Sequence, residues 1–175
     1  HNEKLAGCND LLCIIRPDAI KSIHKAYLES GADIISSNSF NANSVSMQDY
    51  GLHRYPGLIR EINRRAAILA REAADEAPVK DWGGKALVAG SIGPTNRTAS
   101  MSPDVSDPAG RNVDYDSLFE AYCEQVGGLL EGGVDLLLFE TVFDTLNLKA
   151  GLDAADRVME AMGKTVPVMV SATMS

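Results

Sequence analysis

The sequence predicts an α/β fold with a parallel sheet, and three observations support this. Four mainly apolar runs each end in small polar residues or an acid. The segments before and between these runs repeat their apolar residues at helical spacing, so helices and strands alternate along the chain. Such alternation is typical of a parallel sheet with helical crossovers. The predicted strands are residues 32–38, 86–94, 134–141 and 166–173.

Each predicted helix has its own start and stop signals. Pro17 suits a first helical turn and Gly31 suits a helix end. The apolar face of this first helix is formed by Ile20, Ile23, Tyr27 and Leu28. The next three helices are predicted at residues 56–78, 114–133 and 145–163, with Asp114 or a neighbour as a cap. We expect every apolar helix face to pack on the sheet.

Length and composition indicate one globular domain. The chain has 175 residues, of which 45% are hydrophobic and 23% charged. Its net charge of -8 disfavours nucleic acid or an anionic membrane surface as a partner. No segment approaches the roughly 20 apolar residues needed to span a bilayer. Because the chain starts with His1 rather than Met, we expect a piece of a longer protein.

The cysteines do not indicate a metal site. Cys8, Cys13 and Cys123 lack paired spacing and nearby histidines, so neither a disulfide framework nor a zinc site is predicted. A reduced, cytoplasmic setting fits this usage best. We expect Cys123 to be a small core residue. A reactive role for Cys8 or Cys13 is disfavoured, because nothing basic lies at a suitable spacing.

Two polar loops are longer than a scaffold requires. Residues 38–50 follow the first predicted strand, and residues 93–111 follow the second. Both loops should emerge at the carboxyl ends of the strands, where α/β barrels build their active sites. Prolines and side-chain acceptors in the second loop favour an ordered conformation. It is not a Walker loop, because the Gly-Lys-Ser/Thr ending is absent.

Several motifs resemble the homocysteine-binding domain of cobalamin-dependent methionine synthases. The most specific are Gly-Pro-Thr-Asn-Arg-Thr at residues 93–98 and Glu-Thr-Val-Phe-Asp-Thr at 140–145, supported by segments 31–35, 38–41 and 102–105. The resemblance implies part of a TIM-type (β/α)8 barrel, with about half of its strands. It also implies the reaction: a zinc-bound homocysteine thiolate takes a methyl group from methylcobalamin, ultimately from methyltetrahydrofolate, giving methionine.

The resemblance also indicates site residues. An acid at a strand end can hold the ammonium group of homocysteine, so we assign Glu140 to that role. Alternatively, Glu140 caps the next helix or pairs with Arg97. The other candidates for substrate binding are Asn38, Ser91 and Thr141, although Asn38 could equally be a turn residue. Loop support is predicted for Asn96, Arg97 and Asp144, where an Arg97–Asp144 pair would join two strand-end loops.

Much of the barrel implied by the resemblance is missing. The family's first strand, its second half and its zinc cysteines have no counterpart, so residues 1–175 are predicted to be a fragment with no catalytic or metal residue, inactive alone. Its partners would be homocysteine, the remaining barrel half and the cobalamin and folate domains of the parent. Open sheet edges also favour self-association. Two alternatives remain: a cobalamin-independent homocysteine methyltransferase using betaine or S-methylmethionine, or a non-catalytic half-barrel assembly module.

Overall fold

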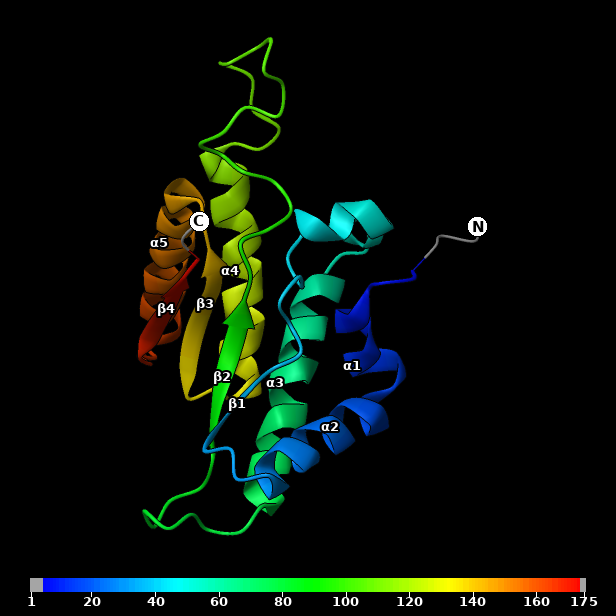
Figure 1. Ribbon diagram of the computed structural model, residues 1–175, viewed down its shortest axis with the longest axis vertical. Coiled ribbons are helices and arrows are strands. Elements are labelled where there is room, and N and C mark those ends of the chain that lie inside the picture. Colours follow the sequence, from blue (N-terminus) through cyan, green and yellow to red (C-terminus); the bar gives the residue numbers. More distant parts are fainter. Residues whose placement is uncertain (1–4, 174–175) are drawn as a thin grey trace.

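The computed structural model describes residues 5–173 and contains one four-stranded sheet (Figure 1). The strands follow one another in the order β1-β2-β3-β4, and every neighbouring pair is parallel. Their bounds are Ile34–Ser36, Leu87–Ile92, Leu136–Val142 and Val168–Ala172. The predicted α/β fold with a parallel sheet is confirmed, with each strand shorter than or shifted slightly from its apolar run.

Helices precede each strand and cover one face of the sheet (Figure 1). The bounds of α2 to α5 are Pro17–Glu29, Leu58–Glu76, Tyr115–Gly132 and Thr145–Met162. The Asp114 side chain caps α4 by accepting a hydrogen bond from Ser117 N–H at 2.7 Å, as predicted. Four short elements were not predicted: α1 (Leu12–Ile15) and three 3-10 helices, Asn9–Leu11, Ser46–Tyr50 and Leu52–Arg54.

The core lies between the sheet and this helical layer. Alternate strand residues such as Ile35, Val88 and Leu137 face the helices and are buried. The Tyr122 ring of α4 meets the Phe139 ring of β3 edge to face, with centroids 6.1 Å apart. Burying each of these side chains stabilises the fold by about 1.5–3 kcal/mol. Cys123 is half-buried against the same core, consistent with its predicted packing role.

Glycines bring α3 and α4 into close contact. A Cβ placed on Gly128 would lie 2.5 Å from the carbonyl oxygen of Arg60 and 2.8 Å from Cβ of Asn63. One turn further along α4, a Cβ on Gly132 would lie 2.5 Å from Cβ of Ala67. Neither position has room for a side chain, so these glycines set the distance between the two helices.

No helix within residues 5–173 covers the opposite face of the sheet, and we call it the uncovered face. Ile34, Leu87 and Met169 on this face are 46%, 36% and 47% exposed. The strand β4 is exposed along its whole length. No helix within residues 5–173 combines the length and apolar character needed to cross a membrane.

One prediction for α2 was only partly right. Ile20 and Leu28 are buried as expected, but Ile23 and Tyr27 are 51% and 63% exposed. The reason is position: α2 flanks β1, the first strand of the sheet, and Ile23 and Tyr27 line an open cavity beside β1 that no other element within residues 5–173 fills.

Candidate functional site

The carboxyl ends of β2 and β3 bring a serine and a glutamate together on the uncovered face. Glu140 stands two residues beyond Leu138, the register partner of Ser91, so the Ser91 and Glu140 side chains point to the same side. The Ser91 Oγ donates a hydrogen bond to Oε1 of Glu140 at 2.5 Å. Ser91 is buried and Glu140 is half-buried. The carboxylate is therefore fixed through one oxygen and still accessible to a small ligand.

Two further serines fix the backbone of Ser91. Its N–H donates to Ser37 Oγ at 3.0 Å, and Ser39 Oγ donates to its carbonyl oxygen at 2.8 Å. The two hydroxyl oxygens lie 2.7 Å apart. From α4, Gln125 Nε2 donates to the Ser39 carbonyl at 2.7 Å. These bonds join the end of β1 to the site. The sequence analysis missed Ser37 and Ser39, although small polar residues ending a strand were the available signal.

A β-bulge distorts β3 directly after Glu140. Between Phe139 and Val142 the strand advances three residues while its partner β4 advances two, from Val170 to Ala172. Within this bulge Thr141 has a φ of 60°, a left-handed conformation that is strained for a β-branched residue. Such strain costs on the order of 1–3 kcal/mol and concentrates at functional sites. The bulge therefore supports the Glu140–Thr141 segment as part of a site.

The loop after β2 is held against the start of α5 by a buried amide. Asn147 Nδ2 donates to the carbonyl oxygens of Pro94 and Arg97, both at 2.8 Å. Asn147 Oδ1 accepts from the N–H of Ala99 at 3.0 Å. One side chain therefore fixes three points of the loop. The sequence analysis did not identify Asn147, because its partners are about fifty residues away.

Asp144, three residues before Asn147, also binds the loop after β2. Its Oδ2 accepts from the N–H and the Oγ of Ser100, at 3.1 and 2.7 Å. Its Oδ1 caps α5 by accepting from the N–H groups of Leu146 and Asn147, at 2.8 and 3.2 Å. Burial opposes ionisation of this carboxyl, but the hydrogen bonds outweigh burial and hold the pKa of Asp144 below its ordinary value.

The two long loops contact each other through Asp49. Asn96 Nδ2 donates to Asp49 Oδ2 at 2.5 Å, and Arg97 Nη2 lies 3.5 Å from Asp49 Oδ1. Arg97 Nη1 also donates to the Val45 carbonyl at 2.8 Å. Because Asp49 and Val45 belong to the loop after β1, both loops lie at the same end of the sheet, as predicted.

The expected Arg97–Asp144 pair is absent. The Asp144 carboxylate already accepts from Ser100 in the loop after β2 and from N–H groups at the start of α5, where the helix dipole also favours a negative charge. Arg97 turns instead toward the loop that carries Asp49. Glu140 neither caps α5 nor pairs with Arg97, since the cap is Asp144 and the Glu140 partner is Ser91.

Asn38 is not oriented toward Glu140. Its Nδ2 donates to the Asn9 carbonyl at 2.9 Å and lies 3.4 Å from Cys13 Sγ. The Asn38 amide therefore links the end of β1 to the N-terminal segment. Of the four predicted substrate-binding residues, the structure joins Ser91 to Glu140, places Thr141 next to them in the bulge, and turns Asn38 away.

A family comparison shows which kind of domain this chain belongs to. The model of the homocysteine S-methyltransferase family matches residues 1–175. The chain belongs to this family. The match covers the motifs at residues 93–98 and 140–145, so the loop and bulge described above are part of a homocysteine S-methyltransferase domain.

Solved structures show how much of this family's fold the chain contains. The metallated homocysteine methyltransferase MmuM from Escherichia coli has a TM-score of 0.65 and 21% identity, with 90% of this chain matching 52% of MmuM. The apo form of MmuM has a TM-score of 0.62 and 20% identity, with 98% matching 54%. The chain spans about half the length of these structures. Its four strands therefore correspond to about half of a homocysteine methyltransferase barrel, as predicted.

The cysteines of this homocysteine S-methyltransferase domain do not fit a zinc site. Within residues 5–173, no group of three or more His, Cys, Asp or Glu side chains could hold a metal ion. Burial raises the pKa of Cys13 to about 11, and burial also raises the pKa of Cys8. Both thiols are therefore protonated at neutral pH in the chain as described here.

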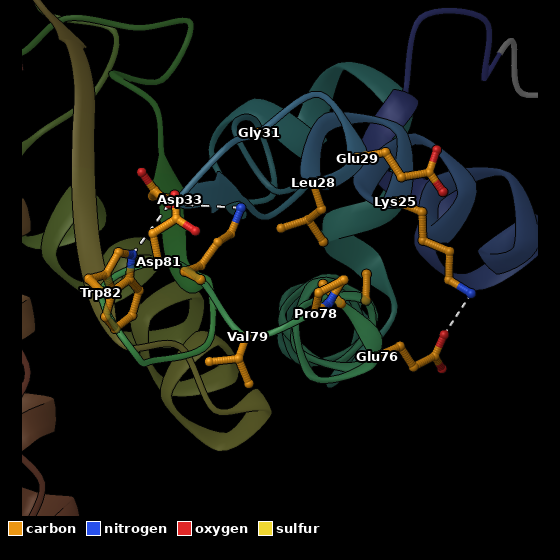
Figure 2. Close-up of a pocket in the computed structure, with 13 residues that line it drawn as sticks. Lys25, Leu28, Glu29, Gly31, Asp33, Glu76, Pro78, Val79, Asp81 and Trp82 are labelled. Carbon is orange, nitrogen blue, oxygen red and sulfur yellow. Dashed lines mark hydrogen bonds and ion pairs between the residues drawn. The ribbon is translucent and has the colours of Figure 1, made fainter.

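A separate cavity of about 700 Å³ lies at the opposite end of the homocysteine S-methyltransferase domain (Figure 2). It is bordered by the residues just before β1 and by the loop between α3 and β2, so it opens at the amino ends of the strands. Four of its charged groups form ion pairs, Asp33 with Lys80 and Lys25 with Glu76. The indole Nε1 of Trp82 also donates a hydrogen bond to Asp33. This cavity is not part of the Glu140 site.

Proposed function

We propose that this chain is the substrate-binding part of a cobalamin-dependent methionine synthase. In this proposal residues 1–175 form part of a barrel domain whose remaining strands lie elsewhere in the parent protein. The parent also contributes the zinc that holds the homocysteine sulfur and the cobalamin and folate domains that deliver the methyl group from methyltetrahydrofolate. The chain alone is then inactive. The observation that carries the proposal is the Glu140 carboxylate, held by Ser91 at the carboxyl end of a parallel sheet.

The role we propose for Glu140 is to bind the homocysteine ammonium. One carboxylate oxygen accepts from Ser91 at 2.5 Å, which leaves Oε2 to accept from a charged N–H donor. Thr141 is exposed beside it and offers a hydroxyl to the substrate carboxylate. Asn96, Arg97 and Asp144 support the loops that border this position. Binding then fixes the amino-acid end of homocysteine. This orients the substrate for an alkyl transfer to its sulfur, which is the contribution we propose for this half of the barrel.

Homocysteine is expected to stabilise the chain against heat, and Glu140→Gln is expected to abolish the effect. A ligand at ten times its Kd raises the free energy of unfolding by about 1.4 kcal/mol through mass action. The neutral amide introduced by this substitution keeps the shape of the side chain but loses the charge that attracts an ammonium group. Thermal unfolding with increasing homocysteine measures the shift. Homoserine should act similarly, because it keeps the amino-acid end and lacks only the thiol.

The matched control is Glu120→Gln, an exposed carboxylate on α4 away from the site. This variant should keep the full homocysteine shift. Equal shifts for wild type and Glu140→Gln would contradict the role of Glu140, and so would a shift given by any amine of similar size.

A second candidate is a cobalamin-independent homocysteine methyltransferase using betaine or S-methylmethionine, because membership of the homocysteine S-methyltransferase family does not fix the methyl donor. The loop motif at residues 93–98 favours the cobalamin-dependent enzyme. Methyl transfer to homocysteine by the full-length parent, measured with methylcobalamin and with S-methylmethionine, separates the two. A parent that uses only S-methylmethionine would overturn our choice of donor and leave the Glu140 site unaffected.

A further inference from the structure

A cavity of about 290 Å³ lies between the two long loops at the carboxyl ends of the strands. Three parts of the chain border it: the loop after β1, the loop after β2 and the first turn of α4. Neither α2 nor any strand lines it, so the free edges of the sheet are not part of it. Its volume is close to the lower end of the roughly 300–1,000 Å³ typical of small-molecule sites. Most of its lining residues are exposed, so a small ligand can enter.

Two arginines, Arg97 and Arg111, give this cavity an excess of positive charge. The other polar side chains that line it are two amides, one hydroxyl and one carboxylate: Gln48, Asn112, Ser117 and Asp114. The Asp114 carboxylate already accepts from the Ser117 N–H at 2.7 Å as the cap of α4. The chain as a whole has a net charge of -8, so most of its surface repels anions. This cavity differs from the rest of the surface in its charge.

Backbone carbonyl groups hold the Arg111 guanidinium in place. Its Nε donates to the Ala99 carbonyl at 2.9 Å, and its Nη1 donates to the carbonyls of Pro108 and Gly110 at 3.0 and 2.7 Å. These acceptors are uncharged, so they orient the guanidinium and leave its charge uncompensated. Within residues 5–173 no carboxylate pairs with Arg111, and its Nη2 has no hydrogen-bond partner. Arg111 is therefore fixed with donors still available.

Arg97 is held in a similar way. Its Nη1 donates to the Val45 carbonyl at 2.8 Å, which is again an uncharged acceptor. Its Nη2 lies 3.5 Å from Oδ1 of Asp49, whose side chain is 55% exposed. An ion pair of this length with an exposed carboxylate is weak, so it compensates little of the Arg97 charge. The cavity therefore has two oriented guanidinium groups and no strong anionic partner for either of them within residues 5–173.

We propose that this cavity binds a phosphate group, either as inorganic phosphate or as the phosphomonoester of a small molecule. The two guanidinium groups match the charge of nearly two on a phosphate, and their N–H groups suit its oxygens in pairs. A single carboxylate carries only one charge. Homocysteine contains no phosphate, so this site is distinct from the one proposed at Glu140. A bound phosphate would join both long loops to the start of α4.

Calorimetric titration of the chain with inorganic phosphate and with glycerol phosphate tests the site. The ionic strength is kept constant, so that general screening does not change during the titration. We expect one phosphate to bind per chain. Tighter binding of glycerol phosphate would identify a phosphomonoester as the ligand, and tighter binding of inorganic phosphate would identify the free ion. Failure of both to bind would overturn the proposal, and so would equal binding of acetate.

Arg111→Gln is expected to weaken phosphate binding by at least about tenfold, because it removes a charged donor. The matched control is Arg54→Gln, which removes the same charge from an exposed arginine outside the cavity. This control should bind phosphate as the wild type does. Equal weakening by both substitutions would mean that net charge, and not the cavity, attracts the phosphate.

Gln48→Glu provides a test that leaves both arginines and their hydrogen bonds in place. The Gln48 side chain lines the cavity, is exposed and has no hydrogen-bond partner within residues 5–173. The substitution adds a negative charge to the cavity wall, so it should also weaken phosphate binding by at least about tenfold. Circular dichroism checks that the variants are folded. Wild-type affinity in Gln48→Glu would show that the phosphate binds elsewhere and would overturn the proposal, even if Arg111→Gln disturbed the loop.

Discussion

Gly128→Ala is expected to lower the free energy of unfolding by about 2–3 kcal/mol, among the largest effects of any single methyl group added to this chain. The new Cβ would lie 2.5 Å from the Arg60 carbonyl oxygen and 2.8 Å from Cβ of Asn63. Both atoms are fixed by the α3 backbone, so the helices must move apart. Urea unfolding of the variant and the wild type measures the difference.

The neighbouring Gly127→Ala is the matched control. Its Cβ would meet the guanidinium of Arg60 at 2.8 Å, the far end of a flexible side chain that can turn away. Doing so gives up an Arg60–Glu131 ion pair whose partners are 44% and 36% exposed, so the loss is below about 1 kcal/mol. Alanine also favours the helix by about 1 kcal/mol over glycine. We expect near-wild-type stability. If Gly127→Ala and Gly128→Ala lowered the free energy of unfolding equally, close contact with the α3 backbone would not be the cause of the loss at Gly128.

The sequence was sufficient for the helices and the order of the strands. Pro17 and Asp114 mark helix starts through local chemistry, and the structure has α2 begin at Pro17 and α4 capped by Asp114. The four apolar runs correctly predicted four strands in a parallel sheet. Like the helix starts, the apolar character of a run can be read from the segment itself, without knowledge of the fold. The short helix α1 and the 3-10 helices were missed because such short segments contain too little periodicity.

The site was harder to predict because its bonds join distant segments. Glu140 was chosen as an acid ending a strand, but its partner Ser91 lies 49 residues away and was linked to it only by the fold. The Ser37–Ser91 bond spans 54 residues. The wrong Arg97–Asp144 pair has the same origin, since charge complementarity names possible partners and only the fold decides which of them meet. Likewise, the apolar pattern of α2 could not show that the outer part of its face would have no neighbour.

Asp144→Ala is expected to lower the free energy of unfolding by about 3 kcal/mol, because it leaves four donors without their acceptor. The carboxylate is 2% exposed and accepts from Ser100 twice, and from the N–H groups of Leu146 and Asn147. Losing a helix cap costs about 1 kcal/mol, and leaving partly buried donors without an acceptor adds about 1–3 kcal/mol. Asp114→Ala, which removes an exposed cap with one hydrogen bond, should cost only about 1 kcal/mol.

The pH dependence of the free energy of unfolding tests whether the ionised Asp144 carboxylate causes this stabilisation. The pKa of Asp144 in the folded chain lies below the ordinary 3.8, so the unfolded state binds the proton more readily. The stabilisation is therefore complete well above pH 3.8 and is lost as the pH falls through the folded pKa. Wild type and Asp144→Asn should differ most near neutral pH and converge in acid, as followed by urea unfolding across that range. A difference that does not change with pH would mean that the shape of the side chain, and not its charge, holds the loop to α5.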